Sequence, residues 1–158
     1  MNIPNFHDGH FDGIRIGPSN LVDLYLRTQD GRAFILVLQE VDALTLTNIK
    51  AGNIIFDLVF RNSDQLTRSD MAELYSLDVD APQTTNLLKA KRELGLQLLE
   101  VNASYGAQGL VLFRAFEIRQ STPDKRATRK LTHSPILSGR VGPALPPFWR
   151  CLLLSCVG

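Results

Sequence analysis

Between Phe11 and Phe60 the sequence alternates apolar and polar residues with a period of two, and this pattern constrains the fold more than any other feature of the chain. Successive side chains of a β-strand point to opposite faces, so the pattern predicts strands with one buried face. Turn residues separate the alternating runs from one another. We expect five strands, over residues 11–16, 21–27, 33–39, 43–48 and 53–60.

The pair Asp30-Gly31 separates the second run from the third. Both central residues of a type I′ hairpin turn have positive φ, and Asp-Gly is a pair that favours this turn. We therefore expect the strands over 21–27 and 33–39 to pair antiparallel. The fourth run, "ALTLTN", alternates leucine with threonine, which is typical of a sheet with one face in water.

After Phe60 two segments have helical spacing. The first, "SDMAELYSL", predicts a short helix with Ser69 or Asp70 as its N-cap. The second, "TTNLLKAKRELG", predicts a helix with Thr85 as its cap and Gly95 in the left-handed conformation that often ends a helix. The apolar residues expected to face the core are Met71, Leu74 and Tyr75 in the first helix and Leu87, Leu88 and Leu94 in the second.

Period-two alternation returns in "LQLLEVN" and "GLVLFRAFEI", which flank the loop "ASYGAQ" and predict a closing hairpin. Five strands, one or two helices and two more strands favour an α+β fold. We expect a single domain over residues 1–120, with a mainly antiparallel β-sheet and the helices packed on one of its faces.

Residues 121–158 differ in composition from the rest of the chain. They carry six Lys or Arg and one acid, five of the eight prolines, both cysteines and the only tryptophan, whereas residues 1–120 carry 11 Lys or Arg and 15 Asp or Glu. We interpret this irregular segment first as translation in a shifted reading frame, second as a disordered native tail and third as a membrane-surface anchor. We expect a chain that ends at Gln120 to unfold at the same temperature as the full chain.

The net charge of +1 gives the chain no broad basic surface, so we expect no nucleic-acid partner. No apolar run approaches the length of a transmembrane helix. The first residues, "MNIPNFHDGH", lack the basic and apolar regions of a secretory signal. We therefore expect a cytoplasmic protein without a membrane partner.

Two histidines and two aspartates lie within six residues of the opening segment: His7, Asp8, His10 and Asp12. Residues two apart in a strand share a face, so His10 and Asp12 would project together. Imidazole and carboxylate groups bind zinc and similar ions, which need at least three protein ligands. The alternative is structural, because Asp8-Gly9 is an ordinary turn pair. We favour a turn that leads into the first strand over a metal or acid/base site.

Elsewhere in residues 1–120 we find no serine elbow, no glycine-rich phosphate loop and no cysteine–histidine pair, and we expect neither catalytic residues nor a cofactor. Asp57 lies on an otherwise apolar strand, and we expect it to pair with Arg114. Tyr105 lies in a loop between two predicted strands. Because loops on rigid scaffolds often carry binding residues, Tyr105 is a candidate binding residue, with an ordinary hairpin turn as the alternative.

The sequence "HDG" at His7 to Gly9 and the sequence "GNIIFD" at Gly52 to Asp57 resemble motifs of small uncharacterised bacterial domains, some of which are grouped with toxin-immunity proteins. The resemblance covers roughly residues 1–120 and implies a small sheet-based binding domain without known catalytic residues. Two hypotheses follow. The first is a non-catalytic protein-binding module of the immunity type, whose partner is another protein. The second is a metal-dependent enzyme that uses the His7, Asp8, His10 and Asp12 cluster.

Overall fold

The computed structural model describes residues 3–121, which form one antiparallel sheet and two α-helices. The predicted α+β fold is thereby confirmed. The predicted tail over 121–158 lies, except for its first residue, outside the described residues. The strands are β1 (His10–Ile16), β2 (Val22–Arg27), β3 (Ala33–Gln39), β4 (Ala43–Thr47), β5 (Asn53–Arg61), β6 (Gln97–Tyr105), β7 (Gln108–Phe113) and β8 (Ala115–Gln120). The helices are the 3-10 helix η1 (Ser63–Gln65), α1 (Arg68–Tyr75) and α2 (Pro82–Glu93).

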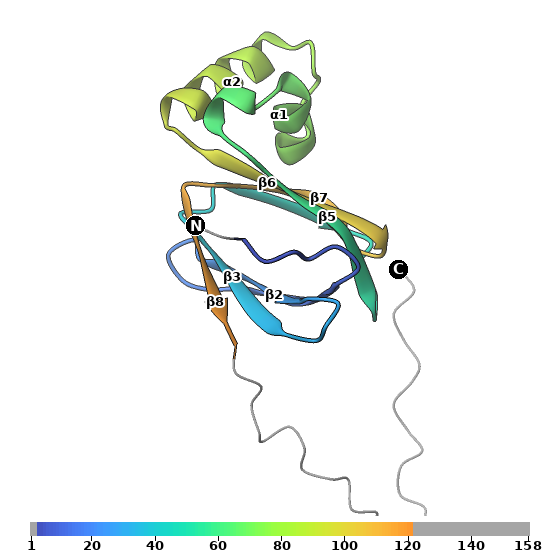
Figure 1. Cartoon of the computed structure of the whole chain (residues 1–158). Helices are drawn as coiled ribbons and strands as arrows, with labels where there is room; N and C mark the ends of the chain where they lie inside the picture. Colours follow the sequence, from blue (N-terminus) through green and yellow to red (C-terminus); the bar gives the residue numbers. More distant parts are fainter. Residues whose placement is uncertain (1–2, 122–158) are drawn as a thin grey trace, which may run out of the picture. The chain divides into compact units, whose positions relative to one another are not determined.

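The sheet has the strand order β4-β7-β6-β5-β1-β2-β3-β8 and curls into two layers. Figure 1 shows β5, β6 and β7 above β2, β3 and β8. Apolar side chains from both layers fill the space between them and form the main core. This core includes Phe11, Leu24, Leu36, Leu38, Ile55, Leu99, Val101, Val111 and Phe113. The rings of Phe60 and Phe116 stack between the layers with centroids 4.8 Å apart.

The helices cover the outer side of the upper layer (Figure 1), where a second core forms. Its buried members are Leu66, Met71, Leu96, Leu98, Leu110 and Leu112. The residues predicted to face the core from the two helices pack here, except for Leu94, which is 49% exposed at the end of α2. Neither helix in residues 3–121 has the length and apolar composition needed to cross a membrane.

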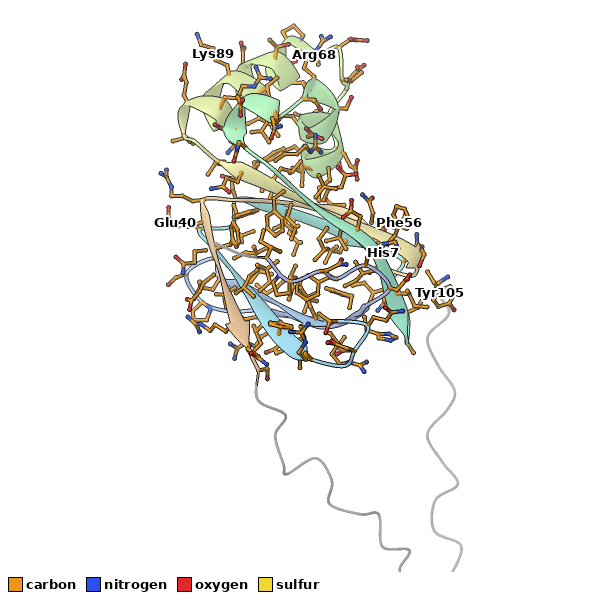
Figure 2. The ribbon with its side chains drawn as sticks, viewed as in Figure 1. His7, Glu40, Phe56, Arg68, Lys89 and Tyr105 are labelled. Carbon is orange, nitrogen blue, oxygen red and sulfur yellow. The ribbon has the colours of Figure 1, made fainter. Side chains whose placement is uncertain are left out.

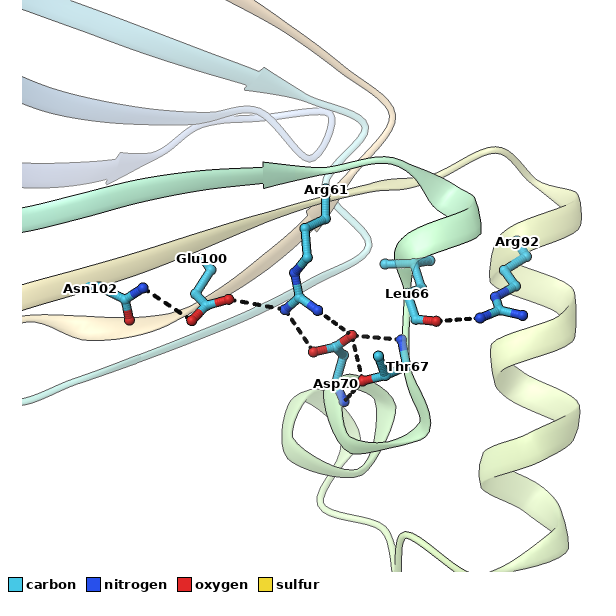
Figure 3. Close-up of polar contacts among 7 residues, drawn as sticks. All are labelled: Arg61, Leu66, Thr67, Asp70, Arg92, Glu100 and Asn102. Atoms are coloured by element: carbon cyan, nitrogen blue, oxygen red, sulfur yellow. Dashed lines mark hydrogen bonds and ion pairs between the residues drawn. The ribbon is translucent and has the colours of Figure 1, made fainter. Parts of the chain in front are cut away.

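A polar network joins the helix layer to the sheet. Figure 3 shows Arg61, at the end of β5, between Asp70 of α1 and Glu100 of β6. Asp70 also accepts a hydrogen bond from the backbone N–H of Thr67 at 2.7 Å, while the Thr67 hydroxyl accepts one from the N–H of Asp70 at 3.2 Å. This reciprocal pair is a capping box that begins α1. The N-cap is Thr67, so the predicted caps Ser69 and Asp70 lie two and three positions too late. Asp70 instead contributes to the cap from the third position of the helix.

The second helix also begins earlier than predicted. Ala81 occupies the N-cap position and Pro82 the first helical position, where a missing N–H costs no hydrogen bond. Thr85 is therefore not the cap. Gly95 follows the helix with φ of +68°, as predicted from the left-handed conformation at helix ends.

The predicted pairing of β2 with β3 is confirmed, but the predicted turn type is wrong. Positive φ occurs at Gly31 and not at Asp30. The N–H of Gly31 donates to the carbonyl of Thr28 at 2.9 Å, so the turn starts at Thr28, one residue earlier than central residues Asp30-Gly31 predict. The Asp30 backbone does not adopt the positive φ of a type I′ turn. Its side chain accepts hydrogen bonds from Thr28 and Arg32.

One side of the two-layer structure is a corner where strands change layers. The run over 109–118, predicted as one strand, is divided at Arg114 into β7 in the upper layer and β8 in the lower. The segment that pairs with this run is divided in the same way, into β3 in the lower layer and β4 in the upper layer. Both runs therefore bend together at residues 40–42 and Arg114, as strands do at the corner of a folded sheet.

Candidate recognition surface

The two segments that carry the family resemblance lie side by side in the structure. The backbone N–H of Asp8 donates to the carbonyl of Ile55 at 3.0 Å, and the N–H of Ile55 donates to the carbonyl of Gly9 at 2.9 Å. Immediately after this contact, β1 pairs with β5 through His10 and Ile54. The motifs "HDG" and "GNIIFD" thus form one local structure at the junction of the two layers.

Gly9 makes this junction sterically feasible. A Cβ atom at this position would collide with the backbone carbonyl of Arg27 in β2 and lie 2.8 Å from the carbonyl oxygen of Phe6. Asp8, immediately before it, has φ of +56°, which Asp tolerates better than most residues. The turn that leads into the first strand, which the sequence favoured, is therefore present, and it directs His7 outward.

A β-bulge in β5 places Phe56 on the surface. The ladder with β6 passes from Ile55 opposite Ala103 to Asp57 opposite Asn102, so Phe56 is left without a partner position. Bulges of this kind redirect a side chain. Phe56 is 56% exposed, although regular alternation with Leu58 and Phe60, which pack against the main core, would have turned it inward.

His7 holds Phe56 in place. The two rings meet edge to face with centroids 5.3 Å apart. The His7 Nδ1 atom lies 2.6 Å from the Phe56 carbonyl oxygen, so Nδ1 carries the proton and donates it. The Phe56 ring is therefore both exposed and supported, a combination that lowers the entropy lost when such a side chain is buried by a partner.

Asn53 organises the neighbouring loops from a buried position. Its Oδ1 accepts hydrogen bonds from the backbone N–H of Lys50 at 2.8 Å and of Ala107 at 3.1 Å, and its Nδ2 donates to the carbonyl of Phe11 at 3.1 Å. The β4–β5 turn and the β6–β7 turn are thereby fixed against β1. Tyr105 is the last residue of β6, directly before the second of these turns, and not in a loop as predicted from the sequence.

Tyr105 pairs with Ile54, two residues before Phe56, and is 51% exposed. The Lys50 Nζ atom lies 5.0 Å from the centroid of the Tyr105 ring, within cation–π range. We refer to His7, Lys50, Phe56 and Tyr105 as the aromatic surface. Figure 2 shows His7, Phe56 and Tyr105 at one end of the upper layer, with Glu40 at the other end.

Of the aromatic surface, Tyr105 was predicted from the sequence as a candidate binding residue and His7 only as a candidate metal ligand, while Phe56 and Lys50 were missed. Phe56 was missed because period-two spacing places it on the core face of its strand. The only local indication is the unbroken apolar triplet Ile54-Ile55-Phe56, in which strict alternation already fails. Lys50 was missed because its position over Tyr105 depends on Asn53, a contact that no sequence pattern reports.

The structure does not gather the four candidate metal ligands, His7, Asp8, His10 and Asp12, into one group. Asp12 lies at a bulge of β1 and forms a bidentate ion pair with Arg27 at 2.5 and 2.7 Å. His7 contacts Phe56, with its Nε2 atom 3.7 Å from the Asp8 carboxylate. In the part of the chain that the structure describes, no group of three or more His, Cys, Asp or Glu side chains is placed to hold a metal ion.

A cleft of about 290 Å³ lies at the corner, between the β1–β2 turn, the bend at 40–42 and the end of α2. Three of its lining residues have positive φ: Ser19, Asn20 and Glu40. Arg114 forms an ion pair here with Glu40, with an Nε–Oε2 distance of 3.0 Å. The predicted pair of Arg114 with Asp57 is therefore wrong, and Asp57 is exposed beside the bulge.

The helices contact this corner through Asp42. The Lys91 Nζ atom donates to Asp42 Oδ1 at 2.8 Å, and the Tyr75 hydroxyl donates to Oδ2. Burial acts to raise the pKa of Asp42, but the hydrogen bonds from Lys91 and Tyr75 outweigh it and leave this pKa below its usual value. Burial and the Asp42 carboxylate both raise the pKa of Tyr75. Asp42 and Glu40 are thus paired with Lys91 and Arg114 within the protein. We therefore assign the corner a structural role and take the aromatic surface as the stronger candidate for a binding site.

In comparisons with known proteins, the chain matches no family model, no curated protein and no solved structure. The resemblance to toxin-immunity proteins therefore stays a prediction.

Proposed function

We propose that this chain is a non-catalytic protein-binding module that engages its partner through the aromatic surface. The observation that carries the proposal is the β5 bulge, which places the Phe56 ring in solvent and leaves it supported by His7. An exposed aromatic side chain held in one position is typical of a residue that dominates the energy of a protein interface.

The composition of the surface supports this proposal. Phe56 and Tyr105 together offer a large apolar area, and full burial of one such side chain is worth about 1.5–3 kcal/mol. Lys50 lies over Tyr105, Asp8 lies beside His7, and Asp57 follows Phe56 at the bulge, so charges of both signs accompany the aromatic rings. An apolar centre with a polar rim is the usual arrangement of a specific interface.

The supporting residues make the surface rigid before a partner arrives. Asn53 fixes both turns that carry Lys50 and Tyr105, and Gly9 allows the close approach that places His7. Binding residues on preformed loops lose less conformational entropy than residues on mobile ones.

The resemblance to immunity proteins extends the proposal to the class of partner. The partner would be a toxin that the chain binds and neutralises in the cytoplasm. The two segments that carry the resemblance supply two of the four residues of the aromatic surface, His7 and Phe56, and they lie side by side in the structure.

The test is a comparative capture from a native lysate of the source cells with the full chain as bait. We expect Phe56→Ser and Tyr105→Ala to lose a partner that the unchanged chain retains. Ile16→Ser is the matched control, because Ile16 is 70% exposed and lies outside the aromatic surface. Retention of every captured protein by the Phe56→Ser variant would contradict the proposal.

The immunity extension is tested on the captured partner. Expression of that partner alone should stop the growth of bacterial cells, and co-expression of the unchanged chain should restore it. Phe56→Ser should fail to restore growth while Ile16→Ser succeeds. If the captured partner has no effect on growth, the chain remains a protein-binding module and the proposal of an immunity function is wrong.

A further inference from the structure

Strand β8 is an edge of the sheet. It pairs with β3 on one side, and within residues 3–121 no strand lies on its other side. An unpaired edge presents a row of backbone donors and acceptors to another chain. The edge at β4 is also free within these residues, but the five residues of β4 carry no charge that would select a register.

The direction of the backbone groups along β8 follows from one hydrogen bond. The N–H of Ser121 donates to the carbonyl of Ala33 at 2.9 Å. Backbone N–H and C=O groups of an antiparallel strand point to alternate sides from one residue to the next. The backbone groups of Arg119 and Glu117 therefore also point towards β3. Phe116, Ile118 and Gln120 therefore present their N–H and C=O groups to the free edge.

The side chains of Glu117 and Arg119 lie on the outer face of the lower layer, opposite in direction to Phe116 and Ile118, which pack against the main core. Glu117 and Arg119 are joined within the chain by hydrogen bonds of 3.0 and 2.7 Å. Both side chains remain about half exposed, at 46% and 58%. They are accessible to a neighbour that pairs with β8.

Two copies of β8 that pair antiparallel can meet in a small number of registers. If Glu117 is centred on the two-fold axis, two carboxylates face each other, and if Arg119 is centred, two guanidinium groups do. If Ile118 is centred, each Glu117 lies opposite the Arg119 of the second copy. Only this last register sets opposite charges across the axis at every such pair, and the charged residues then lie at non-hydrogen-bonded positions, where opposed side chains are closest.

From this self-complementarity we infer that β8 is a homodimer interface, in which two copies of the chain pair edge to edge with Ile118 on the two-fold axis and join their lower layers into one continuous sheet. Each Glu117 carboxylate then lies between the Arg119 of its own chain and that of its partner. The inferred interface is distinct from the aromatic surface, which Figure 2 places on the upper layer.

The test is charge exchange in the full chain, with the mass in solution measured by sedimentation equilibrium. We expect the unchanged chain to form dimers. E117R and R119E alone should each weaken dimerisation by at least about tenfold, because every cross-strand pair then carries like charges. An equal mixture of the two variants should form heterodimers, since each pair becomes opposite in sign again. The double variant E117R/R119E should recover the homodimer.

The matched controls are E93R and K89E, which make the same charge changes on the exposed face of α2, where Lys89 and Glu93 lie 4.0 Å apart. Both should dimerise as the unchanged chain does. Circular dichroism confirms that each variant is folded. A monomeric unchanged chain at micromolar concentration overturns the inference, as does dimerisation that E117R and R119E leave unaltered, because the contact then lies elsewhere. Failure of the mixture to restore the dimer also overturns it.

Discussion

Arg61 and Asp70 form a bidentate ion pair between the end of β5 and the first turn of α1, with N–O distances of 3.0 and 2.8 Å. Asp70 is also the residue that closes the capping box with Thr67. One carboxylate thus begins a helix and attaches that helix to the sheet (Figure 3). The position of the helix layer depends on this side chain as well as on apolar packing.

Asp70→Ala should lower the free energy of unfolding by about 2–4 kcal/mol, because the change removes a cap and leaves the mostly buried Arg61 with Glu100 alone. Urea unfolding followed by circular dichroism measures the loss. Glu93→Ala is the control, since it breaks an exposed pair with Lys89 and should cost less than about 0.5 kcal/mol. Equal losses in the two variants would contradict the role given to Asp70.

Gly9→Ala should destabilise the protein by about 1–3 kcal/mol, because the new Cβ atom collides with the Arg27 carbonyl and forces β1 and β2 apart. Gly13 lies in β1, where an added Cβ atom would meet no heavy atom within 4 Å, so Gly13→Ala should change stability by less than about 0.5 kcal/mol. Thermal unfolding of both variants checks the contrast. A tolerated Gly9→Ala would mean that the junction with β5 adjusts freely.

Asn53→Ala should cost about 2–4 kcal/mol, since the N–H groups of Lys50 and Ala107 both lose their acceptor. The same change should speed amide hydrogen exchange at residues 105–107 while leaving α1 and α2 unaffected. Asn102→Ala is the comparison, because Asn102 donates one hydrogen bond, to Glu100, from a partly exposed position. Unchanged exchange at the β6–β7 turn would contradict the organising role of Asn53.

Stability at alkaline pH should depend on Tyr75. Burial and the Asp42 carboxylate raise the pKa of Tyr75 in the folded protein, so the protonated phenol is favoured by folding. This contribution is complete below the unfolded-state pKa of about 10 and decreases as the pH rises above that value. The stability difference between the unchanged chain and Tyr75→Phe should therefore be constant at neutral pH and shrink above about pH 10.

Urea unfolding between neutral pH and about pH 11, above the ordinary tyrosine pKa, measures this dependence. Tyr105→Phe is the control, because that phenol is half exposed and has no such carboxylate partner among the described residues. Parallel pH curves for the unchanged chain and Tyr75→Phe would show that the hydrogen bond to Asp42 does not persist in solution.

The strands and helices could be predicted from the sequence because local periodicity records which face of each element is buried. Alternation located β1 to β5, and helical spacing identified Met71 and Leu74 as core residues. The predictions failed where one extra or missing residue changes the register. The bulge at Phe56 and the bend at Arg114 are set by contacts with strands distant in sequence. The triplet Ile54-Ile55-Phe56 interrupts the alternation at the bulge without fixing the register, and the bend leaves no periodic signal.

The candidate site was predictable in part for the same reason. Tyr105 could be singled out from its predicted loop, and His7 only as a candidate metal ligand from its cluster with Asp8, His10 and Asp12. Their relation to Phe56 and Lys50 depends on the collision that Gly9 avoids and on the acceptor that Asn53 supplies, and both are contacts between segments about 20 to 50 residues apart. The pairing of Asp57 with Arg114 failed because the corner moves Arg114 away from β5 and towards Glu40.

The corner also determines how the domain unfolds. The two bent runs, β3 with β4 and β7 with β8, each continue from one layer into the other. We therefore expect local opening that starts in the lower layer to propagate through residues 40–42 and Arg114 into the upper one. The two layers should then unfold as a single cooperative unit, whose central amides exchange only when the whole sheet opens.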